Sequence, residues 1–148
     1  MTDPDEELDI ADALAQLSFL VQNALAAVSA RYELSISQVR LLGVLRDREP
    51  AMTELGRYLG LDKSSISGLV DRAERRGLVA RSVSPIDRRA VRVSITDEGR
   101  RLAQAGADEF GARVEHFVAA LPGPDRELLR ALAARVVLAA RPPQLPGG

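Results

Sequence analysis

The chain contains no cysteine and only one histidine, His116, among its 148 residues. Without cysteine it cannot form a disulfide, hold a metal through thiolates or sense oxidants through a thiol. A single histidine leaves too few nitrogen ligands for the usual zinc sites. We therefore expect no metal and no cofactor, and we interpret His116 as a packed helix residue and not as a sensor.

Sequence motifs of the common enzyme classes are also missing. No nucleophile elbow, P-loop or dinucleotide-binding pattern occurs, and the glycines between Gly56 and Gly77 are too scattered for a phosphate cradle. Acidic pairs such as Asp108-Glu109 resemble solvated charges and not acid–base dyads. The sequence predicts that the protein is not an enzyme. It has no evident signal peptide and no apolar run of about 18 residues, which predicts a soluble, cytoplasmic protein.

Lysine is nearly absent, because Lys63 is the only one and every other basic residue is arginine. Arginine suits phosphate and base contacts, although coding bias in a GC-rich genome would give the same composition. Residues 40–101 hold 14 basic and 9 acidic residues, whereas the rest of the chain holds 6 and 12. A basic middle between acidic ends fits a DNA-binding lobe carried on another lobe.

Long helices with an apolar face are predicted towards both ends of the chain. The first spans 4–30, with Asp3 as its cap and Pro4 at its first position. Its apolar residues are spaced alternately by four and three: Ile10, Leu14, Leu17, Val21, Ala24 and Val28. A helix capped by Thr96 repeats this spacing, and a last helix spans 124–140. Because so much apolar surface needs more than one partner, we expect a second subunit.

Shorter helices are predicted in the middle of the chain. Ser35 and Gln38 form a capping box at the start of a helix over 36–47. A short helix over 53–59 stops at Gly60, the residue type that most often ends a helix.

The next helix, 63–76, is capped by Asp62 and ended by Gly77. Its expected buried face has spacings of three and four: Ile66, Leu69, Val70 and Ala73. Two short helices joined by a three-residue turn match a helix-turn-helix.

A hairpin follows, with strands Leu78–Val83 and Ala90–Ile95 joined through the turn residues Ser84-Pro85-Ile86-Asp87. A helix-turn-helix followed by a hairpin is a winged helix-turn-helix. The predicted fold is therefore mainly α with a small β-hairpin wing: a winged helix-turn-helix lobe plus a helical dimerisation lobe.

The outer face of the 63–76 helix begins with small polar residues, which lets the helix approach a DNA groove closely. An arginine at the wing tip can enter a narrow minor groove, with Asp87 as its orienting partner. Read individually, these residues also fit a solvated helix face and an exposed salt bridge. The expected DNA contacts are Ser35, Ser37, Lys63, Ser64, Ser65, Ser67, Gly68, Arg72, Arg75, Asp87, Arg88 and Arg89.

Over about residues 8–140 the chain resembles the MarR family of transcription regulators. The resemblance rests on five segments of the sequence: Leu34-Ser35-x-x-Gln38, Leu61-Asp62-Lys63-Ser64-Ser65-Ile66-Ser67, Asp71…Glu74…Gly77-Leu78, Asp87-x-Arg89 and Ser94-Ile95-Thr96-Asp97-Glu98-Gly99. The chain departs from the family at Gly68, where relatives often carry a larger polar or basic residue. Its lack of cysteine also excludes the thiol-based sensing of one branch of the family.

The resemblance implies a homodimeric repressor of a pseudo-palindromic operator, released by a small aromatic or phenolic ligand. It assigns residues 1–33 and 97–141 to the dimerisation lobe and 34–96 to the DNA-binding lobe. The Pro/Gly-rich composition of residues 142–148 predicts a disordered tail. Together with rough helix placement, the resemblance suggests a ligand cavity where the first long helix, the 36–47 helix and the Thr96 helix meet the DNA-binding lobe. Polar contacts there are expected from Tyr32, Arg40 and Arg113. The alternative function is a winged-helix module that contacts acidic proteins and binds no DNA.

Overall fold

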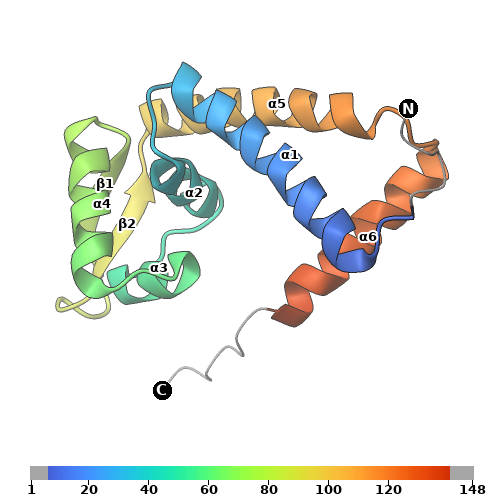
Figure 1. The fold of residues 1–148 in the computed structure, drawn as a ribbon. Coiled ribbons are helices and arrows are strands. Elements are labelled where there is room, and N and C mark those ends of the chain that lie inside the picture. Colours follow the sequence, from blue (N-terminus) through green and yellow to red (C-terminus); the bar gives the residue numbers. More distant parts are fainter. Residues whose placement is uncertain (1–6, 141–148) are drawn as a thin grey trace. The chain divides into compact units, whose positions relative to one another are not determined.

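The computed structural model of the chain describes residues 7–140, and its helices and strands are labelled in Figure 1. In chain order they are α1 (Ile10–Arg31), α2 (Ile36–Leu45), α3 (Met52–Leu59), α4 (Lys63–Arg75), β1 (Val79–Val83), β2 (Val91–Ile95), α5 (Asp97–Val118) and α6 (Gly123–Ala140). The mainly helical fold with a two-stranded hairpin is as predicted. The chain divides into two compact units, Met1–Arg113 and Val114–Gly148.

The core of the first unit is built mainly by α2, α3, α4 and the hairpin. Its buried apolar residues are Leu34, Leu41, Leu42, Leu45, Leu55, Leu59, Ile66, Leu69, Val70, Ala73, Leu78, Val79 and Val93. All four residues expected to form the inner face of α4 are among them, because spacings of three and four bring side chains to one side of a helix. Each large apolar side chain buried in this way contributes about 1.5–3 kcal/mol, which fixes α4 against the lobe.

The predicted helix ends within this lobe are confirmed. The hydroxyl of Ser35 accepts a hydrogen bond from the Gln38 amide, and the Gln38 side chain accepts one from the Ser35 amide, both at 3.1 Å. Gly60 ends α3 with a left-handed backbone at φ 65°, and Gly77 follows α4 at φ 73°. The bounds shift only slightly: α2 ends at Leu45 and not at residue 47, α3 begins at Met52 and not at residue 53, and α4 ends at Arg75 and not at residue 76.

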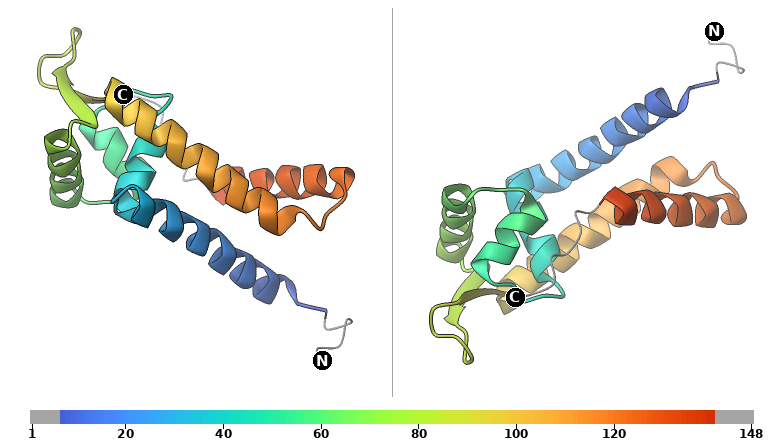
Figure 2. Two further views of the ribbon diagram at one scale, coloured as in Figure 1. Left: turned by 90° about the horizontal axis from the view of Figure 1, so that it is seen from above. Right: turned by 90° about the horizontal axis from the view of Figure 1, so that it is seen from below.

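The hairpin is tied to the loop between α2 and α3. β1 pairs with β2 antiparallel, with Arg81 opposite Val93. Ala51 adds an isolated bridge to Arg92, and the Pro50 carbonyl accepts a hydrogen bond from the Val93 amide at 3.0 Å. From this anchored base the tip of the hairpin projects beyond the neighbouring helices, as Figure 2 shows.

Helix α1 begins later than predicted. It starts at Ile10, where the Asp9 carboxylate accepts a hydrogen bond from the Asp12 amide at 2.8 Å. Asp9 therefore caps the helix, so the predicted start at residue 4 is wrong for the part of the segment that the structure describes. Asp3 and Pro4 lie outside the described residues.

Most of the apolar seam of α1 is not buried within the single chain. Only Ala24 and Val28 are buried, and Ile10 is 80% exposed. By length and composition α1 could also cross a membrane, which corrects the expectation that no segment is apolar enough to do so. Length and composition do not distinguish such a span from a helix that packs into an apolar protein interface.

The second unit contains the end of α5 and the whole of α6. No residue of α6 is buried. Its exposed large apolar side chains are Leu128, Leu132, Val136, Val137 and Leu138. An ion pair between Arg126 and Glu115 links α6 to α5 within this unit. Contiguous exposed apolar surface of this kind usually marks an interaction site.

Candidate nucleic-acid interface

The side of α4 that faces away from the core carries the residues expected to contact DNA. All of them are exposed or half-buried in the structure: Lys63, Ser64, Ser65, Ser67, Gly68, Arg72 and Arg75. Next to Lys63, the first two turns of this side offer only serine and glycine. Because these residues are small, the backbone of α4 can come close to the floor of a DNA groove.

Asp62 fixes the start of α4. Its carboxylate accepts hydrogen bonds from the Ser65 amide at 2.7 Å and from the Ser64 hydroxyl at 3.2 Å. The Ser65 amide and the hydroxyls of Ser65 and Ser64 hold the pKa of the Asp62 carboxyl below its ordinary value of 3.8. The helix start is therefore already capped by a charged group. Lys63 and the serine hydroxyls are the groups left here for phosphate contacts, a role that stays a prediction.

Arg81 in β1 joins the wing to α4 through two carboxylates. Its guanidinium lies 2.7 Å from Asp71 and 3.2 Å from Glu74. Its own amide also donates to the Glu74 carboxylate at 3.1 Å. Both carboxylates are thus neutralised on the side of α4 that faces the wing, so they repel phosphate less. Sequence reasoning missed Arg81, because its pairing depends on how β1 packs beside α4.

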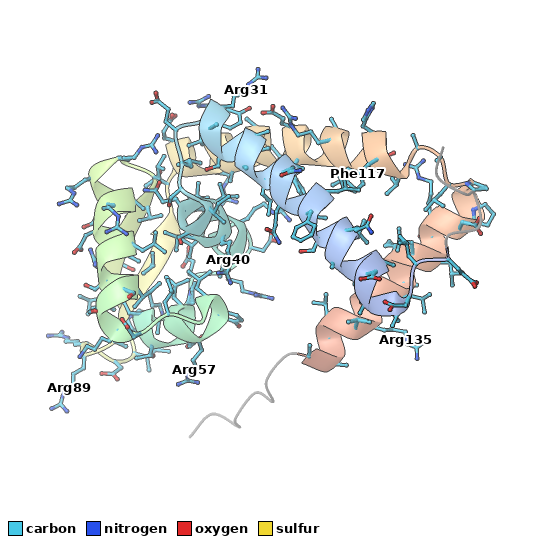
Figure 3. The ribbon with its side chains drawn as sticks, in the orientation of Figure 1. Arg31, Arg40, Arg57, Arg89, Phe117 and Arg135 are labelled. Carbon is cyan, nitrogen blue, oxygen red and sulfur yellow. The ribbon has the colours of Figure 1, made fainter. Side chains whose placement is uncertain are left out.

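The wing tip exposes Asp87, Arg88 and Arg89. The Asp87 carboxylate accepts a hydrogen bond from the Arg89 amide at 3.0 Å, so it shapes the backbone of the tip and does not hold the guanidinium. The buried Ser84 hydroxyl accepts from the amides of Ile86 and Asp87, each at 3.3 Å. Among the described residues neither Arg88 nor Arg89 forms an ion pair, and Figure 3 shows Arg89 pointing away from the protein.

The two remaining candidates lie at the start of α2. Ser37 is exposed there, whereas the hydroxyl of Ser35 is engaged in the capping box. If Ser35 contacts DNA, its hydroxyl must do so while it also accepts the capping hydrogen bond from the Gln38 amide. The DNA-contact roles of both serines, like those of the residues on α4 and the wing, stay predictions.

Two further arginines connect this lobe to the long helices of the first unit. The Arg76 guanidinium, at the end of α4, donates to the carbonyls of Glu33 at 2.6 Å and Tyr32 at 3.3 Å. Arg100 in α5 donates to the Arg46 carbonyl at 2.9 Å. A movement of α1 or α5 against the lobe would therefore pull directly on the ends of α4 and α2.

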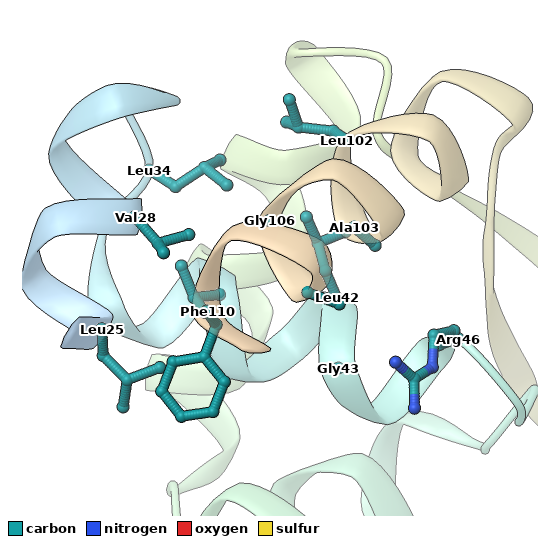
Figure 4. A pocket seen from close by; sticks show the side chains of 12 residues that line it. Leu25, Val28, Leu34, Leu42, Gly43, Arg46, Leu102, Ala103, Gly106 and Phe110 are labelled. Carbon is teal, nitrogen blue, oxygen red and sulfur yellow. The ribbon is translucent and has the colours of Figure 1, made fainter. Parts of the chain in front are cut away.

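A cavity of about 120 Å³ lies between α1, α2 and α5, in the region where the sequence predicted a ligand site. Its walls are apolar, including Leu25 and Val28 of α1 and Phe110 of α5 (Figure 4). Arg46, at the end of α2, is the one charged residue among those that line it. An apolar pocket with a single polar group is a common design for small-molecule sites.

The three residues expected to supply polar contacts do not line this cavity. Arg40 is exposed, and Tyr32 packs against the core of the DNA-binding lobe. Arg113 is exposed and pairs with Glu109 at 3.2 Å. The ligand role of these three residues stays a prediction, and the structure adds Arg46, which sequence reasoning missed.

Comparison with known proteins agrees with this geometry. A family model described as MarR family matches residues 32–90. The HTH-type transcriptional regulator PecS of Dickeya dadantii is 27% identical over 135 residues, which cover 88% of this chain and 81% of PecS. The HTH-type transcriptional repressor NicR of Pseudomonas putida is 38% identical over 74 residues, which cover 49% of this chain and 47% of NicR.

A solved structure extends the similarity over nearly the whole chain. CouR from Rhodococcus jostii RHA1, crystallised with p-coumaroyl-CoA, matches with a TM-score of 0.77 at 26% identity, covering 93% of this chain and 96% of CouR. Together with the capped helix α4 and the arginine-tipped wing, these matches show a DNA-binding regulator of transcription that is similar to the MarR family over residues 32–90.

Proposed function

We propose that the protein represses transcription as a homodimer and leaves its operator when a small ligand binds. The observation that supports the dimer is the exposed apolar surface of two helices. Ile10, Leu14 and Leu20 are exposed on α1, and Leu132 and Val136 on α6. Because a water-exposed surface of this kind is costly, a second copy of the chain that covers it would stabilise the fold. Residues 1–33 and 97–141 then form the dimerisation lobe, and residues 34–96 the DNA-binding lobe.

A two-fold symmetric dimer presents two copies of α4 and two wings. Symmetric recognition helices fit half-sites whose centres lie roughly one helical turn, about 34 Å, apart on one face of the duplex. The preferred DNA is therefore a pseudo-palindrome. Each α4 enters the major groove with Ser64 and Ser65 leading, and Arg89 of each wing reaches the adjacent minor groove.

The cavity between α1, α2 and α5 is the proposed ligand site. Its volume of about 120 Å³ is close to the roughly 150 Å³ of an apolar cavity that holds one benzene ring. A ligand with one aromatic ring fits this space, and an acidic or phenolic group on it would meet Arg46. CouR, whose structure holds p-coumaroyl-CoA, supports an aromatic ligand. We place the protein in the cytoplasm with its DNA, and α1 in a dimer interface and not in a membrane.

Sedimentation and DNA titration together test this proposal. The full chain should sediment with twice its subunit mass of 16.0 kDa. It should bind an inverted repeat selected from random duplexes more tightly than a control duplex with the same composition and scrambled half-sites. The logarithm of its affinity should fall linearly with the logarithm of salt concentration, with a slope of about 0.9 per phosphate contacted. A monomer, or equal affinity for both duplexes, would contradict the proposal.

A further inference from the structure

The middle of α4 lacks a side chain at position 68, where a longer residue could read a base. Position 68 is glycine, flanked one turn earlier by Ser64. The gap at Gly68 is not empty, however. A Cβ at this position would lie 3.2 Å from a terminal nitrogen of Arg72, a tight contact for a Cβ. The guanidinium of Arg72 therefore lies across Gly68.

This placement follows from helix geometry. Residues four apart are neighbours on one helix face, and long side chains lean towards the start of the helix. Arg72 therefore reaches back over Gly68 towards the first turns of α4, which are the part of a recognition helix that meets base edges. The missing side chain of Gly68 leaves this space open, and a long side chain at position 68 would fill it.

The charges around α4 leave Arg72 free to bind DNA. The acidic side chains of α4, Asp71 and Glu74, form ion pairs with Arg81 on the side that faces the wing. Within residues 7–140 no ion pair or hydrogen bond involves the Arg72 guanidinium. A free planar guanidinium in the major groove pairs best with guanine, by donating to its O6 and N7 atoms.

We propose that Arg72 reads a guanine in each half-site and that Gly68 makes this possible by leaving the space in which its guanidinium lies. Arg72 takes over the role that a longer side chain at position 68 would otherwise have. The proposal rests on the operator-binding function proposed above and names the residue pair that sets its sequence preference. It differs from a phosphate contact, which would hold the protein on any sequence equally.

Selection of binding sites from random duplexes by the full chain and its variants tests this proposal. The wild-type site should contain one strongly preferred G·C pair per half-site that Arg72→Ala no longer prefers, while preferences elsewhere remain. At that pair, discrimination in direct titrations should fall by about 5- to 140-fold. Arg75→Ala is the matched control on the same helix: as a phosphate contact it should weaken binding to all sequences alike and leave every base preference in place.

Gly68→Met tests the second half of the proposal. Methionine favours helix more than glycine does, so the variant should fold at least as stably as the wild type in thermal melts. It should still lose the same G·C preference, because its side chain fills the space over which Arg72 lies. Retention of that preference in Gly68→Met would overturn the role of Gly68. A uniform loss of affinity for all sequences in Arg72→Ala would overturn the assignment of Arg72. Absence of any sequence preference in the wild type would overturn operator binding as well.

Discussion

Gly99, in the first turn of α5, lies directly against the carbonyl oxygen of Leu78, which lies between α4 and β1. A Cβ at position 99 would stand 2.0 Å from that oxygen. The same carbonyl accepts a hydrogen bond from the Thr96 amide at 3.1 Å, and the Thr96 hydroxyl donates to the Gly77 carbonyl at 2.6 Å. The junction between wing, α4 and α5 is therefore closed around the missing side chain of Gly99.

Gly99→Ala should destabilise the protein because backbone has to move to admit the methyl group. Overpacking of this kind costs about 1–3 kcal/mol, which chemical denaturation would detect. Gly111→Ala is the matched control on the same helix, since a Cβ there meets nothing within 4 Å. It should stabilise the helix by about 0.5–1 kcal/mol. Equal effects of the two substitutions would show that the close approach at Gly99 does not matter.

Arg81→Met should weaken DNA binding more than it weakens the fold. The Arg81 side chain is 26% exposed and its carboxylate partners are about half exposed, so we expect solvent to limit the loss of stability to about 1 kcal/mol. DNA affinity should fall further, because Asp71 and Glu74 would then face phosphates without compensation. Arg101→Met, which breaks an exposed pair with Glu98, serves as the control. An Arg81→Met variant that binds operator normally would rule out this role.

Local signals explain which parts of this structure the sequence could predict. Ser35, Asp62 and Gly60 act on their own turn of helix, so their capping roles could be read from spacing alone. At α1 the sequence predicted Asp3 as the cap, whereas Asp9 caps the helix in the structure, because any Asp before an apolar helical pattern can serve as a cap. The bond from Arg81 to α4 depends on how a strand packs beside a helix, which no local pattern fixes.

The ligand cavity shows the same limit more sharply. Its position between three helices was predicted. The side chains that face it were not identified, because the rotation of each helix about its own axis was not considered. The residues of α2 and its C-terminal cap that line the cavity are Val39, Leu42, Gly43 and Arg46. These lie at spacings of three and four on one stripe, and Arg40 lies outside it. Extension of this spacing by one more step predicts that Arg46 lies on the same side of the helix.

Replacement of Leu132 and Val136 together by aspartate should abolish the dimer. Both residues are exposed on α6, Val136 by 63%, and a carboxylate in an apolar interface is strongly unfavourable. Sedimentation should give a monomer with helical circular dichroism and weak operator binding. Arg130→Gln, which breaks an exposed pair with Glu127 on the same helix, should stay dimeric. A dimer that survives both aspartates would remove α6 from the interface.

Asp62 should make the free energy of unfolding depend on pH in the acidic range. Its pKa is lowered in the folded state by the Ser65 amide and the serine hydroxyls. The unfolded chain therefore takes up this proton first, so the contribution of Asp62 is complete above its ordinary pKa of 3.8 and is lost as pH falls below it. Asp62→Asn keeps a good capping side chain but cannot titrate. In urea denaturation from about pH 6 to pH 3, the stability difference between wild type and Asp62→Asn should shrink as pH falls. A constant difference would contradict the capping role of the charged carboxylate.

Ligand release should depend on Arg46 and not on Arg113. Arg46 lines the cavity while its carbonyl is held by Arg100, so Arg46→Met changes the charge and leaves that backbone contact in place. Binding of benzoate by calorimetry should weaken by about 1.5–3 kcal/mol, the range for a hydrogen bond to a charged group, whereas binding of phenol should change less. Arg113→Met should bind both compounds as the wild type does.

Ala107→Phe should abolish ligand binding without changing DNA binding. The ring would fill a cavity of about 120 Å³, so benzoate and phenol should no longer bind, while operator affinity without ligand should stay near that of the wild type. In the wild-type protein, each compound should bind the free dimer more tightly than the operator complex, by the same factor with which it weakens operator binding. If Arg113→Met alone lost benzoate binding, the ligand would lie outside this cavity and Arg46 would have no part in its recognition.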